Sequence, residues 1–306
     1  MPAGLFYFTR DYMKLQGIYP ALATCFDDDG NVYKEKITYN VRKLNQVALS
    51  GYLACGSTGE APLLNFDERM QVLECVRDAS AAGRILIAGI GAESVRESVR
   101  LADGAASLGY HAGLALSPHY YKQQMQRPDV QLLYYRALAD QSKLPVLIYN
   151  MPAVTGYDVP VEMVAELSHH PNIIGIKDSS GSLEKIKATL HAVRPGFQVL
   201  SGSGATFGEA FHLGAMGAIL AIANAVPYAC VTVWEAHRTR QEEAARDWQN
   251  RLLPGARIVP AKYGIAGLKH LMDLKGYFGG APRLPLIPPS AEIRTEIEQA
   301  FGGVYS

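Results

Sequence analysis

The stretch Asn172-Ile-Ile-Gly-Ile-Lys177-Asp-Ser-Ser-Gly181 begins as an apolar run of strand length and ends in a lysine followed by hydroxyl-bearing residues. A segment of helical period follows it at 183–193. The same order, a short apolar run and then a longer helical segment, recurs from residue 18 to about residue 222. This alternation is typical of repeated βα units that build a parallel sheet.

Eight runs are predicted to be strands, at 18–24, 51–55, 85–90, 112–116, 145–149, 173–177, 198–201 and 218–222. Helices are predicted between them at 34–49, 93–108, 129–141, 160–169, 183–193 and 206–213, and one more follows the capping box formed by Asn65 and Glu68. A parallel sheet of eight strands can close around a packed interior, so we predict a (β/α)8 TIM barrel over 18–226. An open doubly wound sheet is the alternative.

No further strand is indicated after residue 222, where helical segments run over 227–252, 261–275 and 291–300. The proline-rich stretch 282–289 is predicted to be a turn between the last helices. Residues 227–306 are therefore expected to form a helical extension packed on the barrel. Residues 1–17 are expected to be a poorly defined lead-in, because their apolar patch at 5–8 is too short for the core of a signal peptide.

The composition argues against several classes of partner. The 306 residues carry 29 basic and 29 acidic side chains without a block of like charge, which disfavours binding to nucleic acid or to an anionic membrane. No stretch of about 20 apolar residues is present, as a membrane-spanning helix would need. The cysteines lie apart, without a CxxC pair, and indicate free thiols in a reducing compartment, most simply the cytoplasm: Cys25, Cys55, Cys75 and Cys230.

Lys177 is the first candidate for chemistry, because the active site of a TIM barrel lies at the carboxyl ends of its strands. An amine must be neutral to attack a carbonyl, and burial favours the neutral form. The imine that results draws electrons from the adjacent carbon, so a carbon–carbon bond can be made or broken without a metal or an organic cofactor. The alternative is a lysine that only marks the exit of a strand into solvent.

Two further features could complete such a site. Tyr149 ends the fifth predicted strand, where its phenol could move protons near the imine, although a core aromatic residue is the alternative. Ser57 and Thr58 lie in the glycine-rich turn after the second strand, where hydroxyls and backbone amides can hold a carboxylate. The spacing of Ser57 and Glu60 also fits a capping box.

Other patterns point to no cofactor. The turn at 202–204 follows the seventh strand and is expected to face the substrate, but it lacks the GxGxxG fingerprint of dinucleotide-binding proteins. The eight histidines form no HExxH motif and no spaced set with cysteine. We therefore predict neither a metal site nor a bound cofactor.

Three motifs together resemble the pyruvate-dependent class I aldolases that include dihydrodipicolinate synthase and N-acetylneuraminate lyase. They are Gly56-Ser-Thr-Gly-Glu60, Tyr149-Asn150-x-Pro152 with Thr155-Gly156, and Gly175-Ile-Lys177-Asp-Ser. The resemblance runs from about residue 17 to about residue 288. It implies a barrel with a helical extension, usually a homotetramer built from two tight dimers. It also implies that Lys177 forms the imine, Tyr149 relays protons, and Ser57 with Thr58 holds the pyruvate carboxylate.

The segment Ser117-Pro-His-Tyr-Tyr121 resembles the family segment in which a tyrosine supports the proton relay, in several members across a subunit boundary. Tyr120 is our candidate for that role and Tyr121 the second choice. Two tyrosines that only pack in a loop or an interface are the alternative.

The branch of the family is indicated by one departure. Dihydrodipicolinate synthases have an arginine in the turn after the strand-five tyrosine, whereas this chain has Val154, which cannot form a bidentate pair with a carboxylate. The stretches 152–156, 167–173, 177–181, 263–269 and 276–280 look more like 4-hydroxy-2-oxoglutarate aldolase. That resemblance implies that Ser179 faces the part of the substrate beyond pyruvate, and Gly202 and Ile219 are further expected substrate contacts.

The preferred hypothesis is thus cleavage of 4-hydroxy-2-oxoglutarate to pyruvate and glyoxylate. A dihydrodipicolinate synthase with another carboxylate anchor and a lyase for N-acetylneuraminate or another sugar acid are alternatives within the family. A non-catalytic protein that binds 2-oxo acids on the same scaffold is a more remote one, since a fold does not determine a function.

Overall fold

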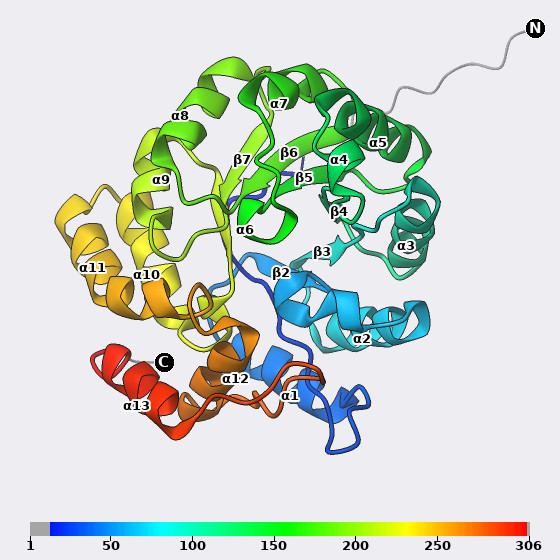
Figure 1. Cartoon of the computed structure of the whole chain (residues 1–306). Helices are drawn as coiled ribbons and strands as arrows, with labels where there is room; N and C mark the ends of the chain where they lie inside the picture. Colours follow the sequence, from blue (N-terminus) through cyan, green and yellow to red (C-terminus); the bar gives the residue numbers. More distant parts are fainter. Residues whose placement is uncertain (1–12, 305–306) are drawn as a thin grey trace, which may run out of the picture.

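The computed structural model describes residues 13–304 and forms a (β/α)8 TIM barrel with a C-terminal helical region (Figure 1). Most of the predicted lead-in, 1–17, lies outside the described residues. The eight parallel strands are β1 (Gly17–Pro20), β2 (Gly51–Ala54), β3 (Ile85–Gly89), β4 (Ala112–Leu116), β5 (Val146–Asn150), β6 (Ile173–Asp178), β7 (Gln198–Ser201) and β8 (Gly217–Leu220). The fold prediction is confirmed, and each strand lies within a few residues of its predicted range.

Contacts between the first two strands close the sheet. The ladder runs in the order β1-β8-β7-β6-β5-β4-β3-β2, so β1 and β2 are the two ends of the row. A parallel bridge joins Ala21 to Leu53, and the Leu22 amide donates to the Leu53 carbonyl at 2.8 Å. The open doubly wound alternative is therefore wrong.

The strands bury two apolar layers, because successive side chains point to opposite faces. One cluster fills the inside of the barrel and includes Leu53, Leu147, Tyr149, Leu200 and Ile219. A larger cluster lies between the strands and the surrounding helices. Burial on both faces explains why the strands are recognisable as nearly continuous apolar runs.

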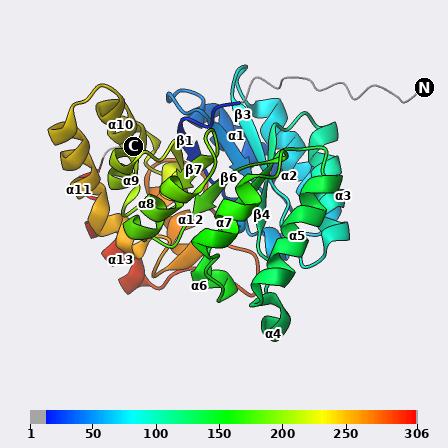
Figure 2. The same cartoon turned by 90° about the horizontal axis from the view of Figure 1, so that it is seen from above.

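The main helices between the strands are α1 (Lys34–Leu44), α2 (Phe66–Ala79), α3 (Val95–Ser107), α5 (Pro128–Gln141), α7 (Val161–Ser168), α8 (Leu183–Ala192) and α9 (Phe207–Leu213). The predicted capping box is present at α2, where Asn65 and Glu68 each bond the other's backbone amide at 2.9 Å. Two short helices were not predicted, α4 (Lys122–Met125) and α6 (Pro152–Thr155). They follow β4 and β5 directly and lie on the same side of the barrel, which is the side where the strands end (Figure 2).

The C-terminal helices are α10 (Pro227–Arg238), α11 (Glu242–Ile258), α12 (Gly264–Leu274) and α13 (Ala291–Ala300). The single helix predicted over 227–252 is wrong, because the chain turns between α10 and α11 and Arg240 adopts the left-handed conformation with φ of 59°. α10 contacts α9 and β1, and Lys43 of α1 donates to the carbonyls of Lys275 and Gly276, which follow α12. Within residues 13–304, no helix is long and apolar enough to span a membrane.

One arginine fastens the segment after α12 to the barrel. The Arg283 guanidinium forms two hydrogen bonds with the Glu68 carboxylate, at 2.7 and 2.9 Å, and also donates to the carbonyls of Gly30 and Leu63. The hydrogen bond from Arg283 holds the pKa of Glu68 below its ordinary value of 4.5. A carboxyl whose pKa is lower in the folded protein stabilises the fold above its ordinary pKa, and this stabilisation is lost as the pH falls through the folded value.

We expect Glu68→Gln to lower the free energy of unfolding at pH 7 by about 1–2 kcal/mol, because a charged hydrogen bond becomes a neutral one. The deficit should shrink as the pH is lowered below 4.5, since the wild-type carboxyl then becomes neutral too. Denaturant titrations at several pH values measure it. Glu74→Gln, on the exposed side of the same helix, is the control and should change stability by less than about 0.5 kcal/mol. A deficit that does not vary with pH would contradict this account.

Candidate active site

Lys177 and Tyr149 lie side by side inside the mouth of the barrel. They are register partners on β6 and β5, and the Lys177 Nζ is 4.3 Å from the centre of the Tyr149 ring. Their exposed fractions are 4% and 5%. The interpretation of Lys177 as a lysine that leaves a strand for solvent is therefore wrong, because its amine is enclosed and faces a phenol ring.

Gly202 lies so close to Ser179 and Lys177 that a larger residue would have to displace their side chains. A Cβ placed on it would be 1.9 Å from the Ser179 Oγ and 2.8 Å from the Lys177 Cε. The Gly202 amide donates to the Asp178 carbonyl at 2.6 Å, which holds the end of β7 against β6. The structure thus brings together three of the predicted residues, Lys177, Ser179 and Gly202.

A polar network supports Lys177 from the outer face of the sheet. The Asn150 amide nitrogen donates to the carboxylates of Asp178, at 2.7 Å, and Asp158, at 2.8 Å. Asp158 also pairs with Lys185 of α8. The sequence analysis missed this network, although the alternation of side chains along β6 already requires Asp178 to point away from Lys177.

The turn that contains Ser57 and Thr58 has a constrained backbone. It forms a short 3-10 helix, Ser57–Gly59, and the residues just before and after the turn, Cys55 and Glu60, both have φ of 55°. Such left-handed conformations are unfavourable for residues other than glycine, persist only where the surroundings impose them, and concentrate at functional sites. Ser57 is half-buried and Thr58 is buried.

Side chains from distant segments impose this conformation. The Thr24 hydroxyl donates to the Gly59 carbonyl at 2.6 Å. The Glu60 carboxylate pairs with Lys269 of α12 at 2.6 Å, and no side chain caps the 3-10 helix. The capping-box interpretation of Ser57 and Glu60 is therefore wrong, because Glu60 points toward the C-terminal region.

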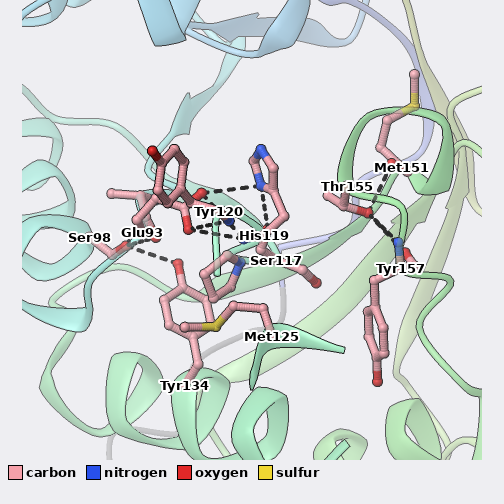
Figure 3. Close-up of polar contacts among 12 residues, drawn as sticks. Glu93, Ser98, Ser117, His119, Tyr120, Met125, Tyr134, Met151, Thr155 and Tyr157 are labelled. Atoms are coloured by element: carbon pink, nitrogen blue, oxygen red, sulfur yellow. Dashed lines mark hydrogen bonds and ion pairs between the residues drawn. The ribbon is translucent and has the colours of Figure 1, made fainter. Parts of the chain in front are cut away.

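Tyr120 lies outside the enclosed pocket of Lys177. Its side chain is 75% exposed and packs edge-on against Tyr121, with ring centres 5.2 Å apart. Glu93 holds this loop by accepting from the amides of His119 and Tyr120, each at 3.0 Å (Figure 3). Glu93, which the sequence analysis also missed, thus fixes the backbone beside Tyr120 within a single chain.

Ile219, the last of the predicted substrate contacts, is fully buried in the cluster inside the barrel, in which Tyr149 also takes part. Among residues 13–304, no group of three or more histidine, cysteine, aspartate or glutamate side chains is placed to hold a metal ion. Burial raises the pKa of Cys55, next to the Ser57 turn, to about 12, which keeps this residue a neutral thiol.

If Lys177 forms the imine that the sequence predicts, we expect Gly202→Ala to lower the rate of its formation by about 100-fold, because the methyl group would displace the lysine side chain by a distance of the order of 1 Å. Borohydride trapping with pyruvate measures the rate, and thermal unfolding reports on the fold. Gly303→Ala is the control, since a Cβ there meets nothing within 4 Å. Equal rates in the two variants would show that Lys177 tolerates the displacement.

The comparisons with known proteins agree over nearly the whole chain. Residues 14–302 match the model of the dihydrodipicolinate synthetase family. A 4-hydroxy-tetrahydrodipicolinate synthase of Methanothrix thermoacetophila is 32% identical over 94% of this chain and 96% of its own. The N-acetylneuraminate lyase of Rhizobium meliloti is 38% identical over 89% of this chain and 90% of its own.

A solved structure carries the likeness into three dimensions. A prophage protein of the dihydrodipicolinic acid synthase family from E. coli K12, in complex with pyruvate, superposes with a TM-score of 0.87. It is 26% identical, and the match covers 94% of this chain and 98% of that one. On its fold, its site residues and these matches, this chain belongs to the dihydrodipicolinate synthase family and is a class I pyruvate-dependent aldolase or lyase.

Proposed function

We propose that the Lys177 amine forms an imine with the 2-oxo group of pyruvate or of a longer 2-oxo acid. The proposal depends on one observation. Lys177 is buried beside Tyr149 at the carboxyl ends of the strands, in a barrel of the dihydrodipicolinate synthase family. A lysine is almost never buried so completely unless it is paired, and no ion pair of Lys177 is found among residues 13–304. Pyruvate in the solved relative supports the same class of substrate.

The chemistry follows from the imine. The neutral amine adds to the carbonyl carbon to form a carbinolamine, and a proton donated to its hydroxyl group lets water leave and gives a protonated imine. Removal of the proton from the 4-hydroxyl group then breaks the bond between C3 and C4, and the electron pair moves toward the imine nitrogen as the aldehyde leaves. Protonation of the enamine at C3 and hydrolysis release pyruvate and the free lysine. Tyr149 is the group beside the amine that moves these protons.

The turn containing Ser57 and Thr58 holds the pyruvate carboxylate. Hydroxyl groups and the amides of a constrained turn together offer several donors to one anion. The left-handed residues at both borders, Cys55 and Glu60, support this assignment because the turn is arranged before a ligand arrives. No cofactor is needed, since Lys177 itself supplies the electron-accepting group.

We favour 4-hydroxy-2-oxoglutarate as the substrate that is cleaved to pyruvate and glyoxylate. Val154 lies on α6, after Tyr149, and gives that turn no cation for the carboxylate of aspartate semialdehyde. Ser179, which lies beside Gly202, would contact the part of the substrate beyond pyruvate in this proposal. A sugar-acid lyase is the second candidate, and the 38% identity to an N-acetylneuraminate lyase favours it.

A second subunit would complete the site in this proposal. Tyr120 is exposed here, so it would reach the proton relay of a neighbouring chain within a homotetramer built as a dimer of dimers. The hydrogen bonds from the His119 and Tyr120 amides to Glu93 support this arrangement, since they order the loop within one subunit. The balanced charge of the chain accords with an enzyme that acts on small 2-oxo acids in the cytoplasm.

Borohydride added together with pyruvate is expected to attach a reduced pyruvyl group to Lys177, because the imine is the species that borohydride reduces. Peptide mass spectrometry locates the label. Lys177→Met should abolish both labelling and turnover, whereas Lys187→Met, on the exposed side of α8, should behave as wild type. Labelling at another lysine would refute the assignment of the nucleophile.

We expect 4-hydroxy-2-oxoglutarate to be cleaved with a kcat/KM at least tenfold above that for N-acetylneuraminate. We also expect condensation of pyruvate with aspartate semialdehyde to be slower still, because Val154 offers no charged partner. Pyruvate release, coupled to lactate dehydrogenase, measures the first two reactions, and direct product analysis measures the third. Preference for the sugar acid would select the second candidate, and efficient condensation would reveal another carboxylate anchor.

A further inference from the structure

The Glu60 and Lys269 side chains form an ion pair that is buried as deeply as any part of the core. The Lys269 Nζ is 2.6 Å from the Glu60 Oε1, and the side chains are 0% and 1% exposed. Glutamate and lysine are almost never buried to this degree unless they are paired. Burial lowers the pKa of Lys269, and the charge of Glu60 opposes that effect.

The remaining polar atoms of the pair are also bonded. Lys269 donates to the Ala281 carbonyl at 3.0 Å, and the Glu60 Oε2 accepts from the Arg283 amide at 2.8 Å. The Lys269 Nζ and the Arg283 guanidinium each lie over the ring of Phe26, at 4.5 and 4.4 Å from its centre. One carboxylate thus joins the turn after β2, the helix α12 and the segment that follows this helix.

The position of Glu60 in the chain connects the ion pair to the turn that contains Ser57 and Thr58. Glu60 directly follows the short helix Ser57–Gly59, and it has the left-handed backbone conformation. Its amide donates to the Ser57 carbonyl at 3.1 Å. A movement of the Glu60 side chain would therefore shift the backbone next to Ser57 and Thr58.

Substitution of Glu60 or of Lys269 alone would leave the other charge buried without its partner. A buried carboxylate without its cation must find another partner or move toward water. Either movement changes the backbone of Glu60 and, through it, the donors of the turn. Replacement of both charges by neutral groups removes the tether while it leaves no charge unpaired.

We infer that Lys269 is a positioning residue for the carboxylate-binding turn: through its buried pair with Glu60, the C-terminal helix α12 holds the Ser57 and Thr58 donors in place for a 2-oxo acid. This inference rests on the proposed function of that turn. It assigns the C-terminal region an indirect part in substrate binding, through the position of the turn.

The test is borohydride trapping of pyruvate at Lys177 over a range of pyruvate concentrations, at a temperature well below unfolding of every variant. Lys269→Met and Glu60→Gln are expected to raise the half-saturating pyruvate concentration tenfold or more. Labelling at saturating pyruvate should stay complete, because Lys177 and Tyr149 are untouched. Lys269→Arg, which keeps the cation, should recover part of the loss.

Leu271→Ala is the matched control, since Leu271 is fully buried on the same helix and its truncation should destabilise the core while it leaves both charges of the pair in place. Its half-saturating concentration should equal that of wild type. If Lys269→Met does not fold, the double variant Glu60→Gln with Lys269→Met, which holds no buried charge, takes its place and should show the same tenfold rise.

Each outcome decides one question. Folded variants that trap pyruvate at the wild-type concentration would overturn the inference alone. So would an equal rise in Leu271→Ala, because general loss of stability would then be the cause. If the wild-type protein traps no pyruvate at Lys177, the proposed function fails and the inference fails with it.

Discussion

Closure of the parallel sheet is the constraint on which the rest of the molecule depends. A parallel strand at an open edge leaves amides and carbonyls unpaired, and here a bridge and hydrogen bonds between the segments of β1 and β2 bring the two edges together. A closed sheet encloses an interior that must be filled by side chains from every strand. It also directs all eight carboxyl ends to one rim, where residues from distant parts of the chain meet.

The rim combines this convergence with very close packing. Lys177 and Tyr149 face each other because they occupy register partners on neighbouring strands, and Gly202 leaves room for the lysine stem because it has no side chain. Asn150 and Asp178 continue the same two strands on the outer face and fix the backbone behind the amine. The lysine stem is thus closely packed on the side of Gly202, which would help to hold the amine in place if Lys177 is the nucleophile of our proposal.

The opposite part of the rim is shaped from outside the barrel. The Ser57 turn follows β2, but its conformation is imposed by Thr24 from the loop after β1 and by Lys269 from α12. The Arg283 contacts with Glu68 hold the segment after α12 against the start of α2. The C-terminal helices therefore stabilise the part of the rim that binds the substrate in our proposal, although they lie beyond the strands.

The barrel could be predicted from the sequence because its signal is local. Each apolar run and each helical period spans only a few residues, and the count of eight follows from them. The boundary between α10 and α11 was missed, because the break depends on a left-handed arginine that has no signature in the periodicity. The short helices α4 and α6 were missed as well, since they are too brief to show a period.

The candidate site shows the same division between what local sequence and what tertiary structure determines. Lys177, Tyr149 and the Ser57 turn could be selected as candidates from the sequence alone, because each lies at or just after the end of a strand and carries a group with a definite reactivity. Tertiary structure alone decided that the amine is enclosed, that Gly202 touches it, and that Glu60 turns to Lys269 instead of capping its own turn. The physical reason is that burial and ion pairing depend on which distant segments meet in space, and no local pattern in the sequence records that.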